Sequence, residues 1–455
     1  PGRGRLRAER PRIMTTPTAT NADAVNSLLA AARQQAEQGA ILQADQLFQR
    51  VLDIAPDQYE ALHFLGMRAL ADGRAVVAKV LLERAVEQDG SDIQLLKNFG
   101  VACIGAERLD EARFALDRAL TLAPDFFIAK LYLGYVLETL GHGHAALKEY
   151  FSAVLMAQAK GRWLSPETTA PPLRELVTSA MRFVDAGRKE LFSGVLAPLR
   201  EQHGADALRR VEHCLDIYLA TAPANYPNPL QKPKFLYLPD LPTTPYFARE
   251  LFDWYAELER NTAVIREELL SVLQAEQGME PFLKFDSPDE VPKFLGAGPQ
   301  GAPAWDAFFF YRHGVRHDDN HARCPRTSAI IEALPLVRIR AHAPEICFSV
   351  LAPGTHILPH HGVTNTRVVT HLPLIVPDDC AIRVGGEEHA WKEGQCVTFD
   401  DTFEHEAWNR SEQTRVVLII DGWNPHLTGV ECEAITWLVE AIGDFNRECG
   451  VVETR

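Results

Sequence analysis

The stretch that decides the fold of the second half of the chain is His356-Ile-Leu-Pro-His360-His361-Gly362, with a further histidine, His405, 45 residues after His360. The imidazole of histidine is a common ligand of redox-active metals. Residues i and i+2 of a strand share a face, so iron is often held by a histidine and a carboxylate two residues later. Gly362 occupies that second position and cannot bind a metal. The stretch therefore predicts a metal site on strands that lacks its usual carboxylate.

The residues around this stretch read as many short strands. From Trp305 onward, segments rich in Val, Ile, Phe and Thr are separated by Pro, Gly and Asp. This texture is typical of an antiparallel sandwich or jelly roll. The expected strands are 307–311, 345–351, 366–374, 380–384, 395–399 and 415–421, together with a segment at 355–359 that leads into His360.

The first third of the chain has a different pattern, an internal repeat of 34 residues. Each unit holds two apolar helical patterns with a turn between them, and it resembles the tetratricopeptide repeat. Four units over residues 21–159 predict an all-α solenoid whose concave groove binds a peptide or protein. The alternative is a scaffold that only packs against the rest of the chain. The repeating positions include Arg50, Arg84 and Arg118; Ala44, Ala78, Ala112 and Ala146; and Gly66, Gly100 and Gly134.

Between these two regions the period is lost. Residues 160–231 read as a helical bridge followed by a proline-rich linker, and we place the start of the second domain, 232–445, near Lys232. A helix is expected from Tyr246 to about Gln277. Residues 1–20 begin with an Arg-rich segment that lacks the apolar core of a secretory signal, and we expect them to be disordered.

Composition narrows the class of protein. The net charge is −15, which disfavours a nucleic-acid or anionic-membrane partner, and no apolar run is long enough for a transmembrane helix. The eight cysteines are scattered without metal-ligand spacing. Reduced cysteines without a signal peptide lead us to expect a cytoplasmic protein.

The motifs of the second domain resemble a known enzyme family. The runs 356–365, 371–372, 391–394 and 399–408 are similar to the aspartyl/asparaginyl β-hydroxylases, over roughly residues 236–427. This resemblance implies a double-stranded β-helix oxygenase that depends on Fe(II) and 2-oxoglutarate and binds its iron with two histidines only. Eukaryotic members also carry tetratricopeptide-like repeats ahead of the oxygenase domain, in the order seen here.

The resemblance also implies roles for individual residues. His360 and His405 match the iron ligands. Ser349 and Arg415 match the pair that binds the far carboxylate of 2-oxoglutarate, and His371 matches a residue near its other end. A guanidinium suits this task because its fork of donors fits a carboxylate.

Further matched positions concern the cosubstrate pocket and the substrate. Trp305 matches a tryptophan that lines the cosubstrate pocket, and Arg367 matches an arginine that meets the acidic side chain of the substrate. Glycine is also the family's residue at Gly362. Val369, in contrast, stands where the eukaryotic pattern has a second arginine, so the substrate is expected to be held differently.

The implied activity is hydroxylation of Cβ of an Asp- or Asn-type residue in a peptide or protein, with release of succinate and CO2. The repeats would contact this substrate. One alternative is hydroxylation of a small molecule or a carrier-bound amino acid. Others are a binding module whose oxygenase fold has lost turnover, and a halogenase in which a halide takes the third metal position.

Overall fold

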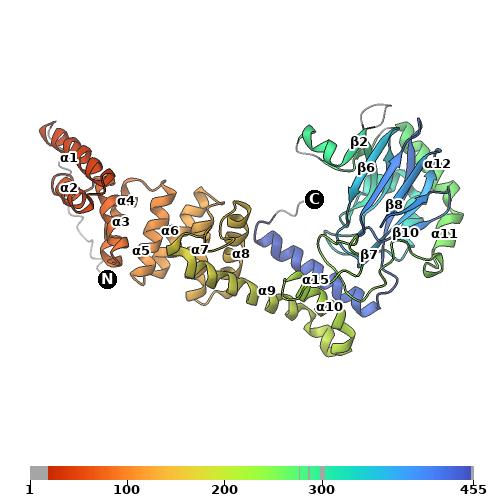
Figure 1. Cartoon of the computed structure of the whole chain (residues 1–455), viewed down its shortest axis with the longest axis horizontal. Helices are drawn as coiled ribbons and strands as arrows, with labels where there is room; N and C mark the ends of the chain where they lie inside the picture. Colours follow the sequence, from red (N-terminus) through yellow and green to blue (C-terminus); the bar gives the residue numbers. More distant parts are fainter. Residues whose placement is uncertain (1–18, 276, 285–286, 298–302, 452–455) are drawn as a thin grey trace, which may run out of the picture. The chain divides into compact units, whose positions relative to one another are not determined.

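The computed structural model describes residues 19–275, 277–284, 287–297 and 303–451 (Figure 1). The chain divides into two compact units, Pro1–Gly187 with Glu448–Val451 and Arg188–Arg447 with Val452–Arg455. The predicted disorder of residues 1–20 falls almost wholly outside the described residues. Within these ranges, no helix combines the length and the apolar character needed to cross a membrane.

The amino-terminal unit consists of successive helix pairs, as the 34-residue period predicts. Its helices are α1 (Ala19–Glu37), α2 (Ile41–Ile54), α3 (Tyr59–Ala71), α4 (Ala75–Gln88), α5 (Ile93–Gly105), α6 (Leu109–Leu122), α7 (Phe127–Thr139) and α8 (Gly143–Ala159), followed by a 3-10 turn at Pro171–Leu173. Figure 1 shows them as an array of hairpins, which confirms the tetratricopeptide-type solenoid.

The repeated glycines explain how the two helices of a unit pack so closely. A Cβ added at Gly66 would lie 2.6 Å from Leu82, and one added at Gly100 would lie 2.9 Å from Leu116. Contacts under 3.0 Å force the surroundings to move, so only glycine fits without displacing its partner helix. The third glycine of the series, Gly134, would similarly meet a tyrosine ring at 2.5 Å. The period is therefore a packing requirement.

The segment that joins the two units differs from its prediction. Helix α9 (Arg174–His203) contains the division between the units, and α10 (Ala205–Tyr218) already packs within the second one. The proline-rich segment was expected to be a linker, but it lies on the second unit. Leu236 is 1% exposed, and Gln231 forms an isolated bridge with Phe403. Proline prevents a regular strand there, because it cannot donate a ladder hydrogen bond.

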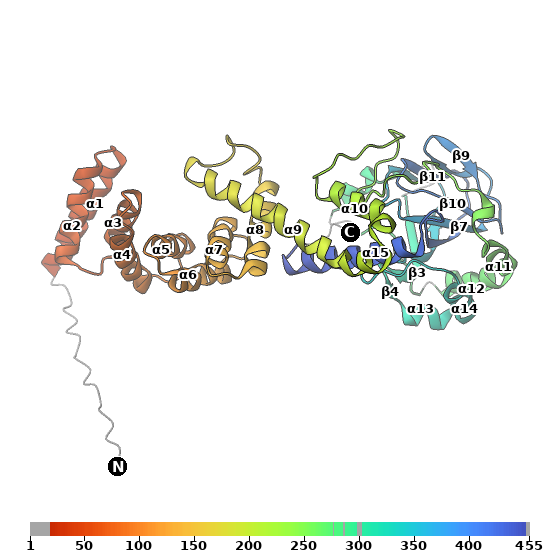
Figure 2. The same ribbon diagram turned by 90° about the horizontal axis from the view of Figure 1, so that it is seen from below.

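The carboxy-terminal unit contains two antiparallel sheets. One has the order β1-β3-β5-β12-β7-β10, with β4 beside β3, and the other has the order β2-β6-β11-β8-β9. This is the jelly-roll-like oxygenase fold predicted from the sequence (Figures 1 and 2). The strands are β1 (Glu280–Pro281), β2 (Leu295–Ala297), β3 (Trp305–Arg312), β4 (Val315–Arg316), β5 (Ile346–Leu351), β6 (Thr355–His360), β7 (Arg367–Ile375), β8 (Cys380–Val384), β9 (Glu387–Ala390), β10 (Val397–Phe399), β11 (His405–Asn409) and β12 (Arg415–Trp423).

Alternation along the strands of the larger sheet separates two cores. On β3, Phe308 and Phe310 pack in one cluster, whereas Phe309 packs in the other, between the sheets. Helices cover the outer face of this sheet, where Leu258 and Leu269 join the first cluster. The remaining helices are α11 (Tyr255–Arg260), α12 (Thr262–Ala275), α13 (Asp318–Arg323), α14 (Pro325–Glu332) and α15 (Gly429–Glu448), with 3-10 turns at Arg249–Leu251 and Pro288–Lys293.

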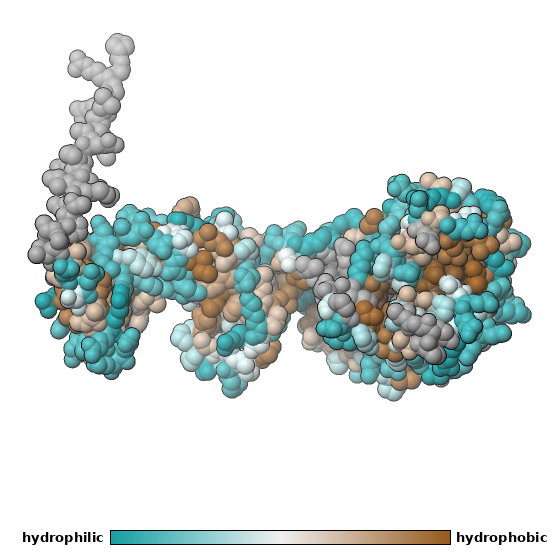
Figure 3. Space-filling view, turned by 90° about the horizontal axis from the view of Figure 1, so that it is seen from above, coloured by the Kyte–Doolittle hydropathy of each residue, from teal (hydrophilic) through white to brown (hydrophobic). Residues whose placement is uncertain are grey.

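The single helix predicted over 246–277 is wrong in detail. The described part of this segment contains a 3-10 turn and two helices, which are separated at Asn261. The Asn261 side chain donates to the backbone oxygen of Glu257 at 2.8 Å and so ends α11. This break lets α11 and α12 follow the surface of the sheet. In Figure 3 the visible face of the carboxy-terminal unit is mainly hydrophilic and includes a large hydrophobic patch.

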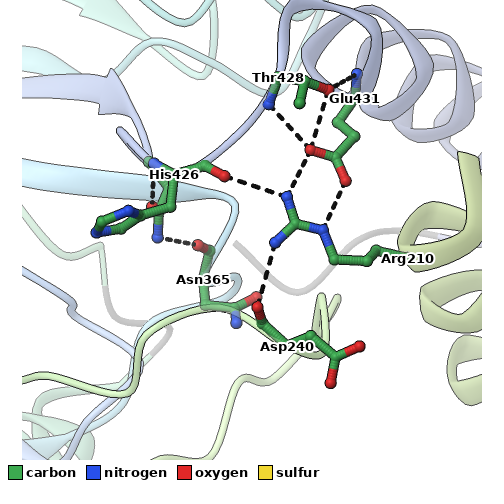
Figure 4. Close-up of polar contacts among 7 residues, drawn as sticks. Arg210, Asp240, Asn365, His426, Thr428 and Glu431 are labelled. Atoms are coloured by element: carbon green, nitrogen blue, oxygen red, sulfur yellow. Dashed lines mark hydrogen bonds and ion pairs between the residues drawn. The ribbon is translucent and has the colours of Figure 1, made fainter. Parts of the chain in front are cut away.

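An ion pair between a half-buried arginine and a buried glutamate fastens α10 to the start of α15 (Figure 4). Arg210 donates from Nε and Nη2 to the two carboxylate oxygens of Glu431, at 2.7 and 2.6 Å. Glu431 also accepts from the backbone nitrogen of Thr428 at 2.9 Å, while its own nitrogen donates to the Thr428 hydroxyl at 3.2 Å. This reciprocal pattern is a capping box. It fixes the chain that leaves β12.

Candidate active site

A cavity of about 240 Å³ lies between the two sheets, and every residue predicted for the site lines it. Residues two apart on one strand face the same way, so alternate residues of each strand point into the space between the sheets. Gly362 and Val369 line the same cavity. The predicted residues are Trp305 on β3, Ser349 on β5, His360 on β6, Arg367 and His371 on β7, His405 on β11 and Arg415 on β12.

The two candidate metal ligands stand directly opposite each other. His360 ends β6 and His405 begins β11, and they are register partners with ring centroids 4.0 Å apart. His360 Nδ1 lies 2.8 Å from the carbonyl oxygen of Leu358, and His405 Nδ1 lies 3.0 Å from that of Phe403. A carbonyl can only accept, so each Nδ1 carries the proton and each Nε2 keeps a lone pair for a metal.

Burial keeps these imidazoles neutral. Burial, together with the neighbouring His360, lowers the pKa of His405 to about 3. Burial also lowers the pKa of His360. Metals bind the neutral form of histidine, so the pair is ready to bind near neutral pH without losing a proton. Among the described residues, no group of three or more His, Cys, Asp or Glu side chains is arranged to hold a metal ion.

A carboxylate nevertheless occupies the space beside Gly362. A Cβ added at Gly362 would lie 2.1 to 2.3 Å from the carboxyl atoms of Asp401. The backbone nitrogen of Gly362 donates to the backbone oxygen of Asp401 at 2.6 Å, which holds the two segments together. Burial raises the pKa of Asp401 to about 7, against the lowering effect of Arg367. Asp401 thus fills the place of the side chain that the strand itself lacks.

Arg415 is a buried cation at the other side of the cavity. It is 1% exposed, and its closest polar contacts are the backbone oxygen and the hydroxyl of Ser349, both 3.4 Å from Nη1. Trp305 donates from its indole nitrogen to the same hydroxyl at 2.9 Å. Burial lowers the pKa of Arg415 to about 10. No described carboxylate forms an ion pair with Arg415, so the pocket is suited to an anionic ligand.

The third charged group of the cavity is already paired. Arg367 donates from Nη1 to Oδ2 of Asp421 at 2.5 Å, and the same oxygen accepts from the backbone nitrogen of Glu345 at 2.8 Å. The charge of Arg367 also interacts with Asp401 and Glu345. Burial raises the pKa of Glu345 to about 7. Val369 follows on the same face of β7, and it adds no charge.

His371 lies between these groups on β7. It is 6% exposed, and its ring packs against Phe399 at 4.9 Å and Trp391 at 5.8 Å between centroids. Burial lowers its pKa well below the usual value, and the charge of Arg415 lowers it further. Its Nδ1 is buried and has no hydrogen-bond partner in the described part of the chain. The residue is therefore a neutral polar group available to a bound molecule.

Sequence reasoning did not assign Asp421, Glu345 or Phe282 to the cavity that they line. Asp421 shares the inward face of β12 with Arg415, and a carboxylate at the end of an apolar strand was a usable signal. Glu345 precedes β5 and offered no such signal. Phe282 stacks on Trp305 with centroids 3.9 Å apart, a contact between segments that are distant in sequence.

Known proteins share this domain. Residues 259–425 match the family model described as aspartyl/asparaginyl beta-hydroxylase. Mouse aspartate beta-hydroxylase domain-containing protein 2 is 35% identical over 225 residues, which are 49% of this chain and 61% of that protein. The jelly-roll-like fold and the paired histidines agree with these matches. Residues 259–425 of the carboxy-terminal unit are therefore similar to the aspartyl/asparaginyl β-hydroxylase family.

Two further relatives widen the picture. Human aspartyl/asparaginyl beta-hydroxylase is 27% identical over 351 residues, 76% of this chain and 40% of that protein. The ornithine lipid ester-linked acyl 2-hydroxylase of Rhizobium tropici is 35% identical over 184 residues, 40% of this chain and 61% of that protein. The chain thus spans 40 to 61% of the length of these relatives.

A solved structure of MamA covers 30% of this chain and 80% of its own chain, at 20% identity and a TM-score of 0.28. This score is too low to support an argument. The solenoid is identified instead by the helix pairs of its repeats and by their close glycine contacts.

Proposed function

We propose that this chain is an Fe(II)- and 2-oxoglutarate-dependent dioxygenase. Its substrate would be an Asp- or Asn-type residue of a peptide or protein, hydroxylated at Cβ with release of succinate and CO2. The single observation that carries the proposal is Arg415, a guanidinium that is 1% exposed and has no carboxylate partner among the described residues. A buried unpaired charge costs several kcal/mol, so the site is built for an anion.

The residues present fit both groups. His360 and His405 offer two neutral nitrogens to a divalent metal, as their carbonyl contacts require. Arg415 and the Ser349 hydroxyl would bind the far carboxylate of the cosubstrate, and Trp305 orients that hydroxyl by donating to it. When bound, the metal would let dioxygen oxidise 2-oxoglutarate and a substrate C–H bond together, so that one oxygen atom enters succinate and the other enters the substrate.

The other residues of the chain supply position and shielding. His371 would contact the cosubstrate near the metal, because its Nδ1 is buried without a partner among the described residues. Asp401 would accept a hydrogen bond from a bound molecule beside the histidine pair, since its Oδ1 is likewise buried and unpartnered within that set. Phe282, stacked on Trp305, would exclude bulk water from this end.

The solenoid suggests how a protein substrate is recruited. Helix repeats of this kind form extended concave surfaces that bind peptides. We propose that the repeats bind the polypeptide that carries the acceptor residue, in a cytoplasmic setting. A lipid or another small-molecule acceptor is the second candidate, favoured by the 35% identity to a protein named as a lipid acyl 2-hydroxylase.

Replacement of Arg415 tests the proposal. Fe(II)-loaded protein, kept without oxygen, would be titrated calorimetrically with 2-oxoglutarate. Arg415→Ala should weaken binding by roughly 10- to 150-fold, because it removes a charged hydrogen bond worth about 1.5–3 kcal/mol. Arg410→Ala, at an arginine that is 59% exposed, is the matched control and should bind normally. Equal affinity for wild type and Arg415→Ala would contradict the proposal.

A further inference from the structure

The substrate end of the cavity holds more carboxyl groups than cations. Arg367 and Arg415 are the described lining residues with a permanent positive charge, whereas Glu345, Asp401 and Asp421 carry carboxyl groups. Arg415 lies with Ser349 on the cosubstrate side in the proposed function. Arg367 is therefore the cation left for a substrate.

Arg367 is already neutralised by the protein. Its Nη1 donates to Asp421, which is 2% exposed and also accepts from the backbone of Glu345. Its charge interacts with Asp401 and Glu345 as well. A substrate carboxylate placed here would add a further negative charge in a buried site, and like charges at short range repel strongly at low dielectric.

A carboxamide suits the same groups better. A carboxylate offers only acceptors, whereas a carboxamide offers two N–H donors and one acceptor oxygen. The Nε of Arg367 is buried and has no hydrogen-bond partner among the described residues, so it can donate to the amide oxygen. The amide N–H groups can donate to the surrounding carboxylates. Val369 lies two residues further along the same face of β7, and it contributes an apolar surface to the cavity at a position where a basic side chain would add a positive charge.

We infer that the acceptor side chain is an uncharged carboxamide of the asparagine type, and that Arg367, Asp421, Glu345 and Val369 together exclude the corresponding carboxylate. This inference rests on the proposed function and narrows its substrate. Val369 and Glu345 are specificity-determining residues in this account. These two residues determine which acceptor side chain binds, whereas other residues bind the metal and the cosubstrate.

The test uses the full-length chain with Fe(II) and 2-oxoglutarate. Two pooled peptide libraries would share randomised flanks and differ only in a central Asn or Asp, and mass spectrometry would count products that gain one oxygen. Wild type should favour Asn by about tenfold or more, the ratio that corresponds to about 1.4 kcal/mol. Val369→Arg should move the Asp-to-Asn ratio at least tenfold toward Asp. Val369→Leu is the control, because it enlarges the same side chain without adding a charge, and it should keep the wild-type Asp-to-Asn ratio.

A second variant guards against misfolding of the first. Glu345→Gln removes an ionisable carboxyl group without adding bulk, and above pH 7, where Glu345 carries its negative charge, it should shift the ratio toward Asp by several-fold. Equal or greater use of Asp by wild type would overturn the inference. So would Val369→Arg and Glu345→Gln variants that bind 2-oxoglutarate normally but gain no Asp product. Products found only on lipid acyl chains would also overturn it. Loss of 2-oxoglutarate binding in the wild type would instead refute the proposed function.

Discussion

Gly362 should be intolerant of even one methyl group, and Asp401 should be the cause. In Gly362→Ala the new Cβ would lie 2.1 to 2.3 Å from the carboxyl atoms of Asp401, more than 1 Å inside ordinary contact. The backbone hydrogen bond from Gly362 to Asp401, 2.6 Å long, resists separation of the two segments. Overpacking of this kind costs about 1–3 kcal/mol. Gly362→Ala should therefore lower the free energy of unfolding by that amount.

A double-mutant cycle isolates the cause. Asp401→Ala removes the clashing carboxyl group, so Gly362→Ala combined with Asp401→Ala should recover most of the loss, with a coupling energy of about 1–3 kcal/mol. The assay is urea unfolding of the metal-free protein, followed by tryptophan fluorescence. Gly422→Ala is the control, because nothing lies within 4 Å of a Cβ added there. If Gly362→Ala cost no more than Gly422→Ala, the placement of Asp401 would be wrong.

Two further predictions concern buried charges. Arg210→Ala should destabilise the protein by about 3 kcal/mol in urea unfolding, because the Glu431 side chain, which is 4% exposed, loses its partner. The double variant Arg210→Met, Glu431→Gln should recover part of this stability. An unchanged urea midpoint in Arg210→Ala would refute the prediction. Burial raises the pKa of Glu345 from 4.5 to about 7, so the folded protein favours the protonated form of this carboxyl group. The contribution of the protonated group to the free energy of unfolding is complete below about pH 4.5 and is lost as the pH rises through 7. Glu345→Gln should remove this loss, roughly 1–3 kcal/mol between pH 5 and 8, in melting curves of metal-free protein; an unchanged pH slope would count against it.

The parts of the fold with a local period were predictable. The 34-residue repeat required close helix contacts at Gly66 and Gly100, and the structure shows those contacts. The alternation of the strands could also be predicted, because burial of one face of a sheet requires an apolar side chain at every second residue. The predicted site residues therefore converge on one cavity although they come from six strands.

The parts set by distant contacts were not predictable. Asp401 reads as an ordinary turn residue, and only the pairing of its segment with Gly362 shows that it fills the missing side-chain position. The prolines between residues 223 and 245 resemble those of a linker, yet Leu236 and Leu238 are buried against the second unit. In both cases tertiary packing overrides the local signal.

The central claim is that His360 and His405 alone hold the metal. The most direct measurement is an anaerobic titration of metal-free protein with Fe(II) in the presence of 2-oxoglutarate, read from the visible charge-transfer absorption of the complex. Wild type and His356→Ala should bind one iron per chain, since His356 pairs with Glu406 and lies outside the cavity lining. The double variant His360→Ala, His405→Ala should show no absorption and no stoichiometric iron. A double variant that still binds one iron and develops the absorption would contradict the two-histidine site.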